Sequence, residues 1–282
     1  MSDHASLIRE TAVAGLFYPS DPNELRETIL GYLDGAETEP PAGAVVGLIA
    51  PHAGYVYSGP TAGRAYAAVR GRSYRRVVVM APSHRAVFDG ASVWPEGAYR
   101  TPLGDAPVDG EGARLLVERG DGLVRALPEV HREEHALEVQ IPFLQVALGS
   151  FSLVPLILGD RDLEFAKRLA ALLADCFGAE DTLYVASSDL SHFHAYDDAV
   201  RIDRMLLELV RSGETERLAA ALDHGETEAC GAGPILTLAR ASAERFGARP
   251  RLLGYANSGD TAGGRREVVG YASFAFVREE ER

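Results

Sequence analysis

Short runs of consecutive apolar residues alternate with amphipathic stretches along the chain, and this alternation sets the expected fold. The apolar runs are typical of buried strands, and apolar residues at three- and four-residue spacing between them predict helices. We expect strands over residues 45–50, 76–81, 153–158, 183–188, 251–256 and 268–276. We expect helices over residues 22–33, 60–69, 113–117, 134–144, 163–177, 197–210, 215–222 and 230–246.

Strands that alternate with helices indicate an α/β fold, with a mostly parallel or mixed central sheet and helices on both faces. Two prolines refine the expected helices: Pro60 should begin one, and Pro142 should kink or divide the helix expected over 134–144. Residues 85–110 contain short strand and turn signals, and residues 35–43 form a polar connection. Because the chain contains no evident linker, we expect residues 1–282 to form one domain.

Composition excludes several classes of protein. A formal net charge of −13 over 282 residues repels phosphate backbones, so we expect no binding to nucleic acid. The chain has 2 cysteines and 46% hydrophobic residues, which is typical of a globular protein without a disulfide framework. Residues 1–5 do not resemble the start of a signal peptide, and no run is long and apolar enough to span a membrane. We therefore expect a cytoplasmic protein.

Candidate chemistry appears where three expected strands end. His52 follows the first strand, His84 follows the second, and Asp189 and His192 follow the strand over 183–188. Ligands of open α/β sheets bind outside the carboxyl ends of the strands, so these side chains could share one crevice. Two imidazoles and a carboxylate are the ligand set of non-haem Fe(II), whereas imidazoles and a thiolate suit zinc or copper. The alternative is that Asp189 or Ser188 caps the following helix, but the histidines at the ends of two other strands favour a site.

Cys230 stands at the start of an expected helix, and a helix N-terminus lowers the pKa of a thiol. It could therefore be a metal ligand or a nucleophile, although most free cysteines are small core residues. Cys176 lies in an apolar helical pattern and is assigned to packing. Glu134, His135 and Glu138 could support a site, but a solvated helix face explains the two carboxylates equally well. His131, His194 and His224 are interpreted as bystanders.

Several of these segments, in this order, resemble the motifs of the MEMO family. The resemblance covers nearly the whole chain, and its motifs lie at residues 50–55, 82–84, 134–143, 187–192 and 230–235. It implies a fold similar to that of the class III extradiol dioxygenases, the LigB-like group. It also implies a metal pocket formed by His52, His84 and Cys230, with Asp189 and His192 beside it. AMMECR-type and radical SAM proteins are implied as possible partners, because prokaryotic relatives of the family carry the name AmmeMemoRadiSam.

The third metal position differs from the dioxygenase pattern. Those enzymes hold iron with two histidines and a glutamate, whereas the matching residue here is Cys230. A thiolate donates more charge to a metal and can itself be oxidised, so ring cleavage does not follow from the resemblance. Near a cation and a helix N-terminus, the Cys230 thiol is expected to ionise readily.

Three functions follow from these observations. The first is a metal-dependent, dioxygenase-like oxidoreductase with catalytic residues Asp189 and His192 and a pocket that favours iron, with copper or zinc as alternatives. The second is a binding module that retains an old enzyme pocket for a metal, a peptide or a partner protein. The third is zinc-dependent hydrolysis, which cysteine and histidine ligands would allow. The residues leave open whether Cys230 or Asp189 is the third ligand.

Overall fold

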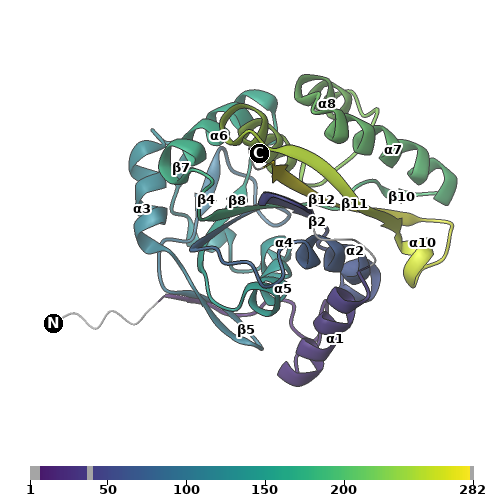
Figure 1. Cartoon of the computed structure of the whole chain (residues 1–282), viewed down its shortest axis with the longest axis horizontal. Helices are drawn as coiled ribbons and strands as arrows, with labels where there is room; N and C mark the ends of the chain where they lie inside the picture. Colours follow the sequence, from purple (N-terminus) through teal and green to yellow (C-terminus); the bar gives the residue numbers. More distant parts are fainter. Residues whose placement is uncertain (1–6, 37–40, 280–282) are drawn as a thin grey trace.

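A large mixed sheet forms the centre of the protein (Figure 1). The computed structural model describes residues 7–36 and 41–279. Residues 1–5, on which the expectation of no export rests, lie outside these ranges, as do residues 37–40 of the expected polar connection. Within the described ranges the sheet has nine strands in the order β10-β12-β2-β9-β3-β8-β4-β7, with β11 paired to β12. The strands are β2 (Ala44–Ala50), β3 (Arg76–Pro82), β4 (Ala91–Val93), β7 (Val124–Arg125), β8 (Ser152–Leu158), β9 (Thr182–Ser187), β10 (His192–His194), β11 (Arg249–Asn257) and β12 (Val268–Arg278).

The middle of this sheet is parallel. Strand β9 pairs with β2 on one side and with β3 on the other, and β3 pairs with β8, in each case in parallel. Antiparallel strands lie towards both edges, where β12 pairs with β2 and β4 pairs with β8. The prediction of an α/β fold with a mostly parallel or mixed sheet is therefore confirmed.

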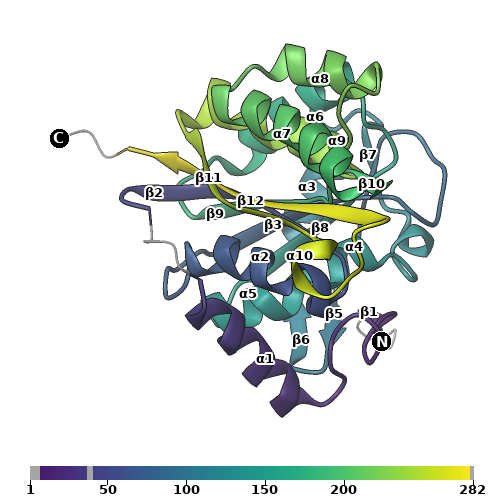
Figure 2. The same ribbon diagram turned by 90° about the vertical axis from the view of Figure 1, so that its right-hand side faces the viewer.

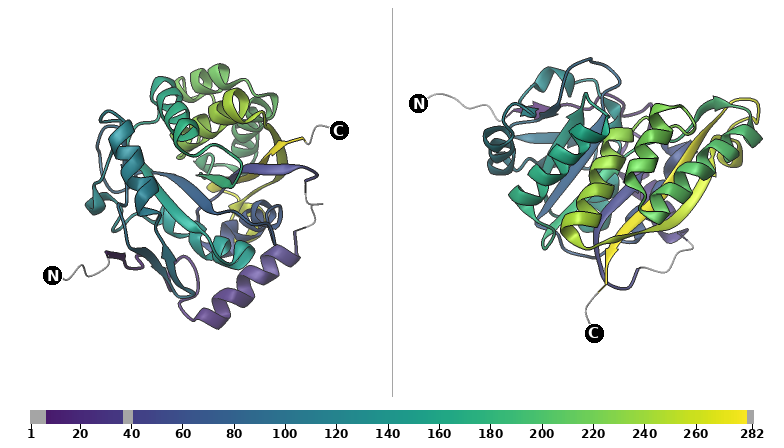
Figure 3. Two further views of the ribbon diagram at one scale, coloured as in Figure 1. Left: turned by 60° about the vertical axis from the view of Figure 1, so that its left-hand side comes forward. Right: turned by 90° about the horizontal axis from the view of Figure 1, so that it is seen from above.

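Helices cover both faces of the sheet (Figures 2 and 3). One layer contains α1 (Pro22–Asp34), α2 (Tyr55–Ala67), α4 (His135–Glu138) and α5 (Gln140–Leu148). The other contains α3 (Gly110–Arg119), α6 (Leu163–Phe177), α7 (Tyr196–Ser212), α8 (Thr215–Asp223) and α9 (Ala232–Ala241). Three short segments, η1 (Pro128–Val130), η2 (Ser242–Phe246) and α10 (Ser258–Thr261), complete the helices. No helix in the described ranges combines the length and the apolar character needed to cross a membrane.

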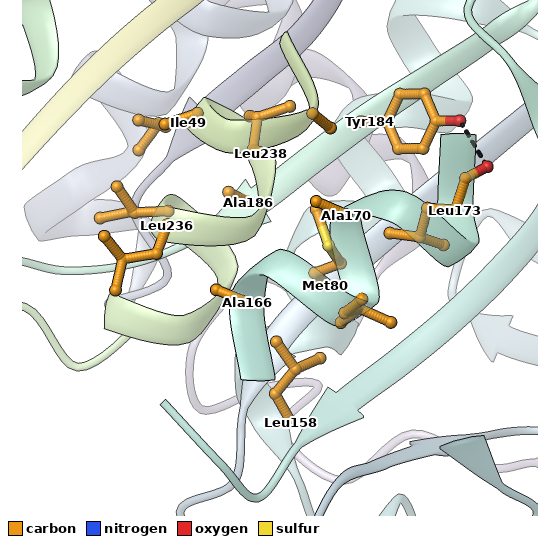
Figure 4. Close-up of a cluster of buried hydrophobic side chains, with 14 of the residues drawn as sticks. Ile49, Met80, Leu158, Ala166, Ala170, Leu173, Tyr184, Ala186, Leu236 and Leu238 are labelled. Carbon is orange, nitrogen blue, oxygen red and sulfur yellow. Dashed lines mark hydrogen bonds between the residues drawn. The ribbon is translucent and has the colours of Figure 1, made fainter. Parts of the chain in front are cut away.

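Side chains of the central strands point alternately to the two helix layers, as the pleat of a strand requires. Val78 and Met80 of β3 pack against the layer that contains α6 and α9, whereas Val77 and Val79 pack against the layer that contains α1 and α2. Figure 4 shows the first of these cores, in which α6 and α9 place small and branched residues over Met80. The continuous apolar runs in the sequence follow from this burial on both faces.

One helix differs from the sequence prediction, and another is divided as predicted, although not at the proline itself. The helix expected to begin at Pro60 begins at Tyr55, so Pro60 lies inside α2. The helix expected over 134–144 is divided at Val139, before Pro142. Pro142 then occupies the first turn of α5, where a missing N–H group leaves no helix hydrogen bond unmade.

A buried ion pair fastens the N-terminal segment to α4. Arg9 belongs to β1 (Ile8–Arg9), which forms a small sheet with β5 (Ala98–Thr101) and β6 (Gly104–Pro107). The guanidinium of Arg9 contacts the carboxylate of Glu138, and both side chains are fully buried. Glu138 also accepts hydrogen bonds from the backbone N–H of Ala12 at 2.8 Å and from the hydroxyl of Tyr18 at 2.5 Å. The alternative that Glu138 belongs to a solvated helix face is therefore wrong.

We expect Glu138→Gln to lower the free energy of unfolding by about 3–5 kcal/mol, because it leaves the Arg9 charge buried and unpaired. Urea denaturation followed by circular dichroism measures the change. Glu118→Gln, which removes the exposed partner of Arg114 on α3, is the matched control and should change stability by no more than about 0.5 kcal/mol. Equal effects of the two substitutions would show that burial of the Arg9 pair contributes little.

Candidate metal centre

His52 lies in the loop after β2 and is 2% exposed. Its Nδ1 atom is 2.9 Å from the hydroxyl of Ser187, at the end of β9. That hydroxyl donates to the carbonyl of Ala136 at 2.7 Å and accepts from the side-chain amide of Gln140 at 2.7 Å. Because the hydroxyl proton is already used, Nδ1 of His52 is the donor to Ser187 and Nε2 keeps its lone pair. Burial, followed by the neighbouring imidazoles, holds the pKa of His52 well below its usual value.

His84, in the loop after β3, is oriented by Glu134. Its Nδ1 atom lies 3.0 Å from one carboxylate oxygen of Glu134, and its backbone N–H donates to the other at 2.5 Å. Burial alone would raise the pKa of Glu134, but the hydrogen bonds and charge of His84 bring it below its usual value. An ionised carboxylate only accepts, so Nδ1 of His84 carries the hydrogen, and when the ring is neutral Nε2 has the lone pair that could bind a cation. The carboxylate of Glu134 is buried, so it too does not belong to a solvated face.

His135, the first residue of α4, completes a cluster of three imidazoles. Its ring stacks on that of His84 with the centroids 4.9 Å apart, and it meets the ring of His52 edge-on at 5.6 Å. One ring nitrogen from each of the three histidines lies within 4.8 Å of the others. The Nδ1 atom of His135 is buried and makes no hydrogen bond to the described residues. These three histidines could therefore hold a metal ion.

The structure places Cys230 against His52, with Sγ 3.1 Å from Nε2. The backbone N–H of Asp189 donates to this sulfur at 3.2 Å. Gly231 allows the close approach, because a Cβ atom there would lie 2.3 Å from the carbonyl oxygen of Ser187. Cys230 does not belong to the group of three whose ligand atoms are mutually within 4.8 Å, which His135 completes instead.

The protein itself does not make the Cys230 thiol easy to ionise. Burial, followed by the charge of Asp189, raises the pKa of Cys230 above its usual value. The hydrogen bonds from Asp189, Ser188 and Gly231 lower it by less. Ready ionisation of Cys230, which the sequence analysis expects beside a cationic metal, therefore depends on the charge of a bound ion and stays a prediction.

Asp189 joins the ends of β9 and β2. Its Oδ1 atom accepts from the backbone N–H groups of His52 at 2.7 Å and Ala53 at 3.3 Å, and Oδ2 lies 3.9 Å from Nε2 of His52. These contacts differ from a cap on the following helix, which begins only at Tyr196. Burial raises the pKa of Asp189 to about 7, because the two hydrogen bonds offset only part of the cost of ionisation.

His192 is the first residue of β10 and is half-buried. Burial lowers the pKa of its imidazole, so the neutral ring is favoured. The backbone N–H of His192 donates to Glu228 at 3.3 Å, and the same carboxylate binds the ring of His194 at 2.8 Å. Glu228 and His194 therefore hold the strand that carries His192.

The tautomer of His52 can be tested directly. We expect ¹⁵N NMR of the histidine side chains to find Nδ1 of His52 protonated and Nε2 unprotonated, because Ser187 offers only a lone pair. Ser187→Ala removes that acceptor and should shift the His52 nitrogen resonances towards a mixture of tautomers. Ser83→Ala is the control, since the Ser83 hydroxyl donates to the carbonyl of Ala86. Unchanged His52 resonances in Ser187→Ala would contradict this assignment.

The sequence of the chain matches a known family over most of its length. A family model described as Memo-like protein matches residues 9–275. A MEMO1 family protein of Thermoplasma volcanium is 37% identical over 82% of this chain and 85% of its own length. A MEMO1 family protein of Aeropyrum pernix is 39% identical over 83% of this chain and 87% of its own.

The chain also has a more distant likeness to a solved structure. An uncharacterized protein of Escherichia coli is 16% identical, with a TM-score of 0.47 over 72% of this chain and 86% of that one. The sequence matches carry the assignment, because the family model spans residues 9–275 and the two relatives are 37% and 39% identical over 82% and 83% of this chain. This protein, with two histidines of its cluster in loops after strands and the third at the start of α4, belongs to the MEMO family.

Proposed function

We propose that this protein is a metal-dependent redox enzyme related to the class III extradiol dioxygenases, with iron as the favoured metal and copper as the alternative. The observation that carries the proposal is the convergence of unprotonated nitrogen atoms and a thiol at the carboxyl ends of β2, β3 and β9. His52 and His84 each have Nδ1 bound to a hydrogen-bond acceptor, so both offer Nε2 as a ligand. Histidines oriented in this way are typical of metal sites.

We assign the metal to His52, His84 and Cys230, with His135 as the neighbouring donor that could replace or join the thiolate. The distance of 3.1 Å between Cys230 Sγ and His52 Nε2 supports this set, because both atoms could reach one ion. Imidazole ligands suit iron, copper and zinc, and a thiolate adds charge to the ion. A bound iron or copper ion would supply electron transfer and oxygen chemistry that side chains alone do not provide.

Asp189 and His192 are proposed as the catalytic residues that handle protons. A carboxyl group with a pKa of about 7 can hold or release a proton near neutral pH. A neutral imidazole at His192 can accept a proton, and Glu228 fixes the backbone that carries it. The two groups therefore have the properties of a general acid and base next to the proposed ion.

A second candidate function is a binding module without turnover. Five large apolar side chains that are 41–106% exposed lie on segments next to the site residues, and they are Leu16, Val56, Tyr57, Val87 and Phe193. A contiguous patch of such residues would be typical of a surface that binds a peptide or a protein. On this alternative the histidine cluster would have a structural or binding role.

Metal analysis of protein purified without oxygen separates these functions. Stoichiometric iron or copper supports the redox enzyme. Stoichiometric zinc would instead favour hydrolysis, and no retained metal together with weak affinity for all three would favour the binding module. The measurement is mass spectrometry of the metals per mole of protein.

We expect Cys230→Ser to weaken metal binding at least about tenfold, since serine does not replace a thiolate ligand. Cys176→Ser is the matched control, because Cys176 packs against the core on α6 and should leave metal content unchanged. Titration of the metal against a competing chelator measures both. Equal metal affinity in wild type and Cys230→Ser would show that Cys230 is a packing residue and not a ligand. His135→Ala would then be the variant that loses the ion.

We expect His192→Ala to keep its metal and to lose its proton-transfer role, because His192 is assigned to substrate or solvent. The metal content of His192→Ala and His52→Ala is compared under identical conditions. His52→Ala should lose the ion, since His52 belongs to both candidate ligand sets. A loss of metal in His192→Ala as complete as in His52→Ala contradicts this division of roles.

A further inference from the structure

The backbone that leads to His192 is held at three successive N–H groups. The N–H of Leu190 donates to a carbonyl of β12 at 2.8 Å, and the N–H of Ser191 donates to the carboxylate of Asp203 at 3.0 Å. The N–H of His192 itself donates to Glu228 at 3.3 Å. Two of the three acceptors are carboxylates, which bind N–H groups more strongly than neutral carbonyls do. Groups outside β10 therefore hold the backbone that carries His192.

Pairing within the sheet supports β10 only weakly. The strand is three residues long and forms an edge of the sheet, where β12 is its partner strand. The register of this pair shifts between His192 and His194. A short edge strand with an irregular register makes few regular hydrogen bonds to its neighbour. The contacts from outside the sheet are therefore needed to fix its position.

Asp203 makes its contact from a helix that covers this edge. Helix α7 packs on β10, β11 and β12 (Figure 1), and the side chain of Asp203 on it is fully buried. Its Oδ1 atom accepts from Ser191, and its Oδ2 atom accepts from the hydroxyl of Tyr255 at 2.8 Å. Burial raises the pKa of Asp203, and these hydrogen bonds offset only part of that effect. The chain thus keeps a carboxylate here despite the cost of its desolvation.

The neighbouring strand leaves room for this carboxylate. At Gly270 of β12, a Cβ atom would lie 2.0 Å from Oδ2 of Asp203, so a larger residue would displace the carboxylate. The N–H of Gly270 donates to the carbonyl of Ser191 at 2.9 Å. Both polar backbone groups of Ser191 are therefore bound, one by Asp203 and the other by Gly270.

The residue after His192 shows that the path of β10 is imposed on the chain. Phe193 has a φ of 63°, in the left-handed region that residues other than glycine seldom adopt. Its side chain is 71% exposed, so burial of the ring does not compensate the strain. Strained residues persist where the surrounding structure over-determines them, and they gather at functional sites. The contacts of Ser191 and His192 hold the backbone immediately before this strained residue.

We propose that Asp203 is a positioning residue of the site, which acts through Ser191 to hold His192 in place against the strain at Phe193. His192 lines one cavity with Cys230, which brings it to the side of the candidate metal centre. The role of His192 in proton transfer rests on the proposed redox function. The positioning of its ring rests only on the contacts described above.

The test observes the ring of His192 by NMR in protein with ¹³C-labelled histidine, before and after the addition of Co²⁺ as a paramagnetic probe. Wild type should give one signal for the His192 ring. Asp203→Ala should replace it with a broadened signal or several signals, and should change the shift that Co²⁺ induces in it. The ring of His131 is the internal reference and should stay unchanged, because it is fully buried and bound to Tyr99 and Ser92.

Three further variants separate positioning from a general contribution to stability. Asp203→Asn keeps an oxygen that can accept from the N–H of Ser191, so it should retain the single His192 signal. Tyr255→Phe removes the other hydrogen bond of Asp203 and should lower Tm without changing the His192 signal. Asp198→Ala is the matched control, because Asp198 is an exposed carboxylate of the same helix, and should change neither quantity.

Relief of the strain provides a second, independent test. Glycine adopts a positive φ without strain, so Phe193→Gly removes the force that displaces the backbone. We expect the double variant Asp203→Ala/Phe193→Gly to regain a single His192 signal, which Asp203→Ala alone lacks. A double variant with the same broadened signal as Asp203→Ala would overturn the proposal that Asp203 acts against this strain.

A His192 signal in Asp203→Ala that equals the wild-type signal would overturn the proposal, and so would equal changes in Asp203→Ala and Asp198→Ala. If Asp203→Ala does not fold, Gly270→Ala provides the same test, because its Cβ atom displaces the carboxylate. A changed His192 signal in protein where Co²⁺ shifts no histidine would support the positioning role and contradict the metal-dependent function. An unchanged His192 signal in protein where Co²⁺ does shift the histidines would do the reverse.

Discussion

The position of β9 between β2 and β3 is the constraint on which the site depends. Parallel pairing aligns Ala50 of β2 with Ser187 of β9, and Met80 of β3 with Ala186 of β9. His52 and His84 follow strands that are not neighbours, and the end of β9 lies between them. Ser187 is therefore close enough to hold the ring of His52, and Asp189 to hold its backbone. Another strand order would separate these contacts.

Three buried carboxylates near the site differ in the groups that compensate their charge. Glu138 faces the guanidinium of Arg9, Glu134 faces the ring of His84, and Asp189 receives only backbone N–H groups. The pKa of Glu134 is lowered, whereas that of Asp189 is raised to about 7. When carboxyl groups of one pocket have different surroundings, one of them can stay ionised while another gains and loses a proton near neutral pH. Among these carboxyl groups, Asp189 is the one suited to proton exchange.

The sequence predicted the strands and the residues at their ends because both depend on local pattern. A run of apolar residues indicates a buried strand, and the polar residues His52, His84 and Asp189 come shortly after the ends of three such runs. The burial of Glu134 and Glu138 could not be predicted in this way. Their partners, His84 and Arg9, lie 50 and 129 residues away in the sequence. The spacing of residues along a helix contains no information about such distant partners, so it does not distinguish a solvated helix face from a buried one.

Local rules also failed where tertiary contacts outweigh them. The preference of proline for the first turn places a helix start at Pro60, but α2 begins at Tyr55. The backbone N–H of Tyr55 donates to the carbonyl of Phe17, and its hydroxyl donates to the carbonyl of Val139. At Cys230, burial has a larger effect on the pKa of the thiol than the helix N-terminus has, so the expected ionisation depends on a bound cation. His135 carries no local signal beyond its place after Glu134, and only the fold brings its ring onto that of His84.

The contact between Cys230 and His52 has a consequence for the order in which the protein folds. These residues are 178 positions apart, so their meeting closes a loop that includes most of the chain. Contacts of such high sequence separation form late, because the entropy of loop closure must be overcome first. During synthesis, β2, β3 and β9 emerge from the ribosome before Cys230 does. The strand ends can therefore assemble while the thiol is still absent, and the arrival of α9 completes the pocket as one of the last steps of folding.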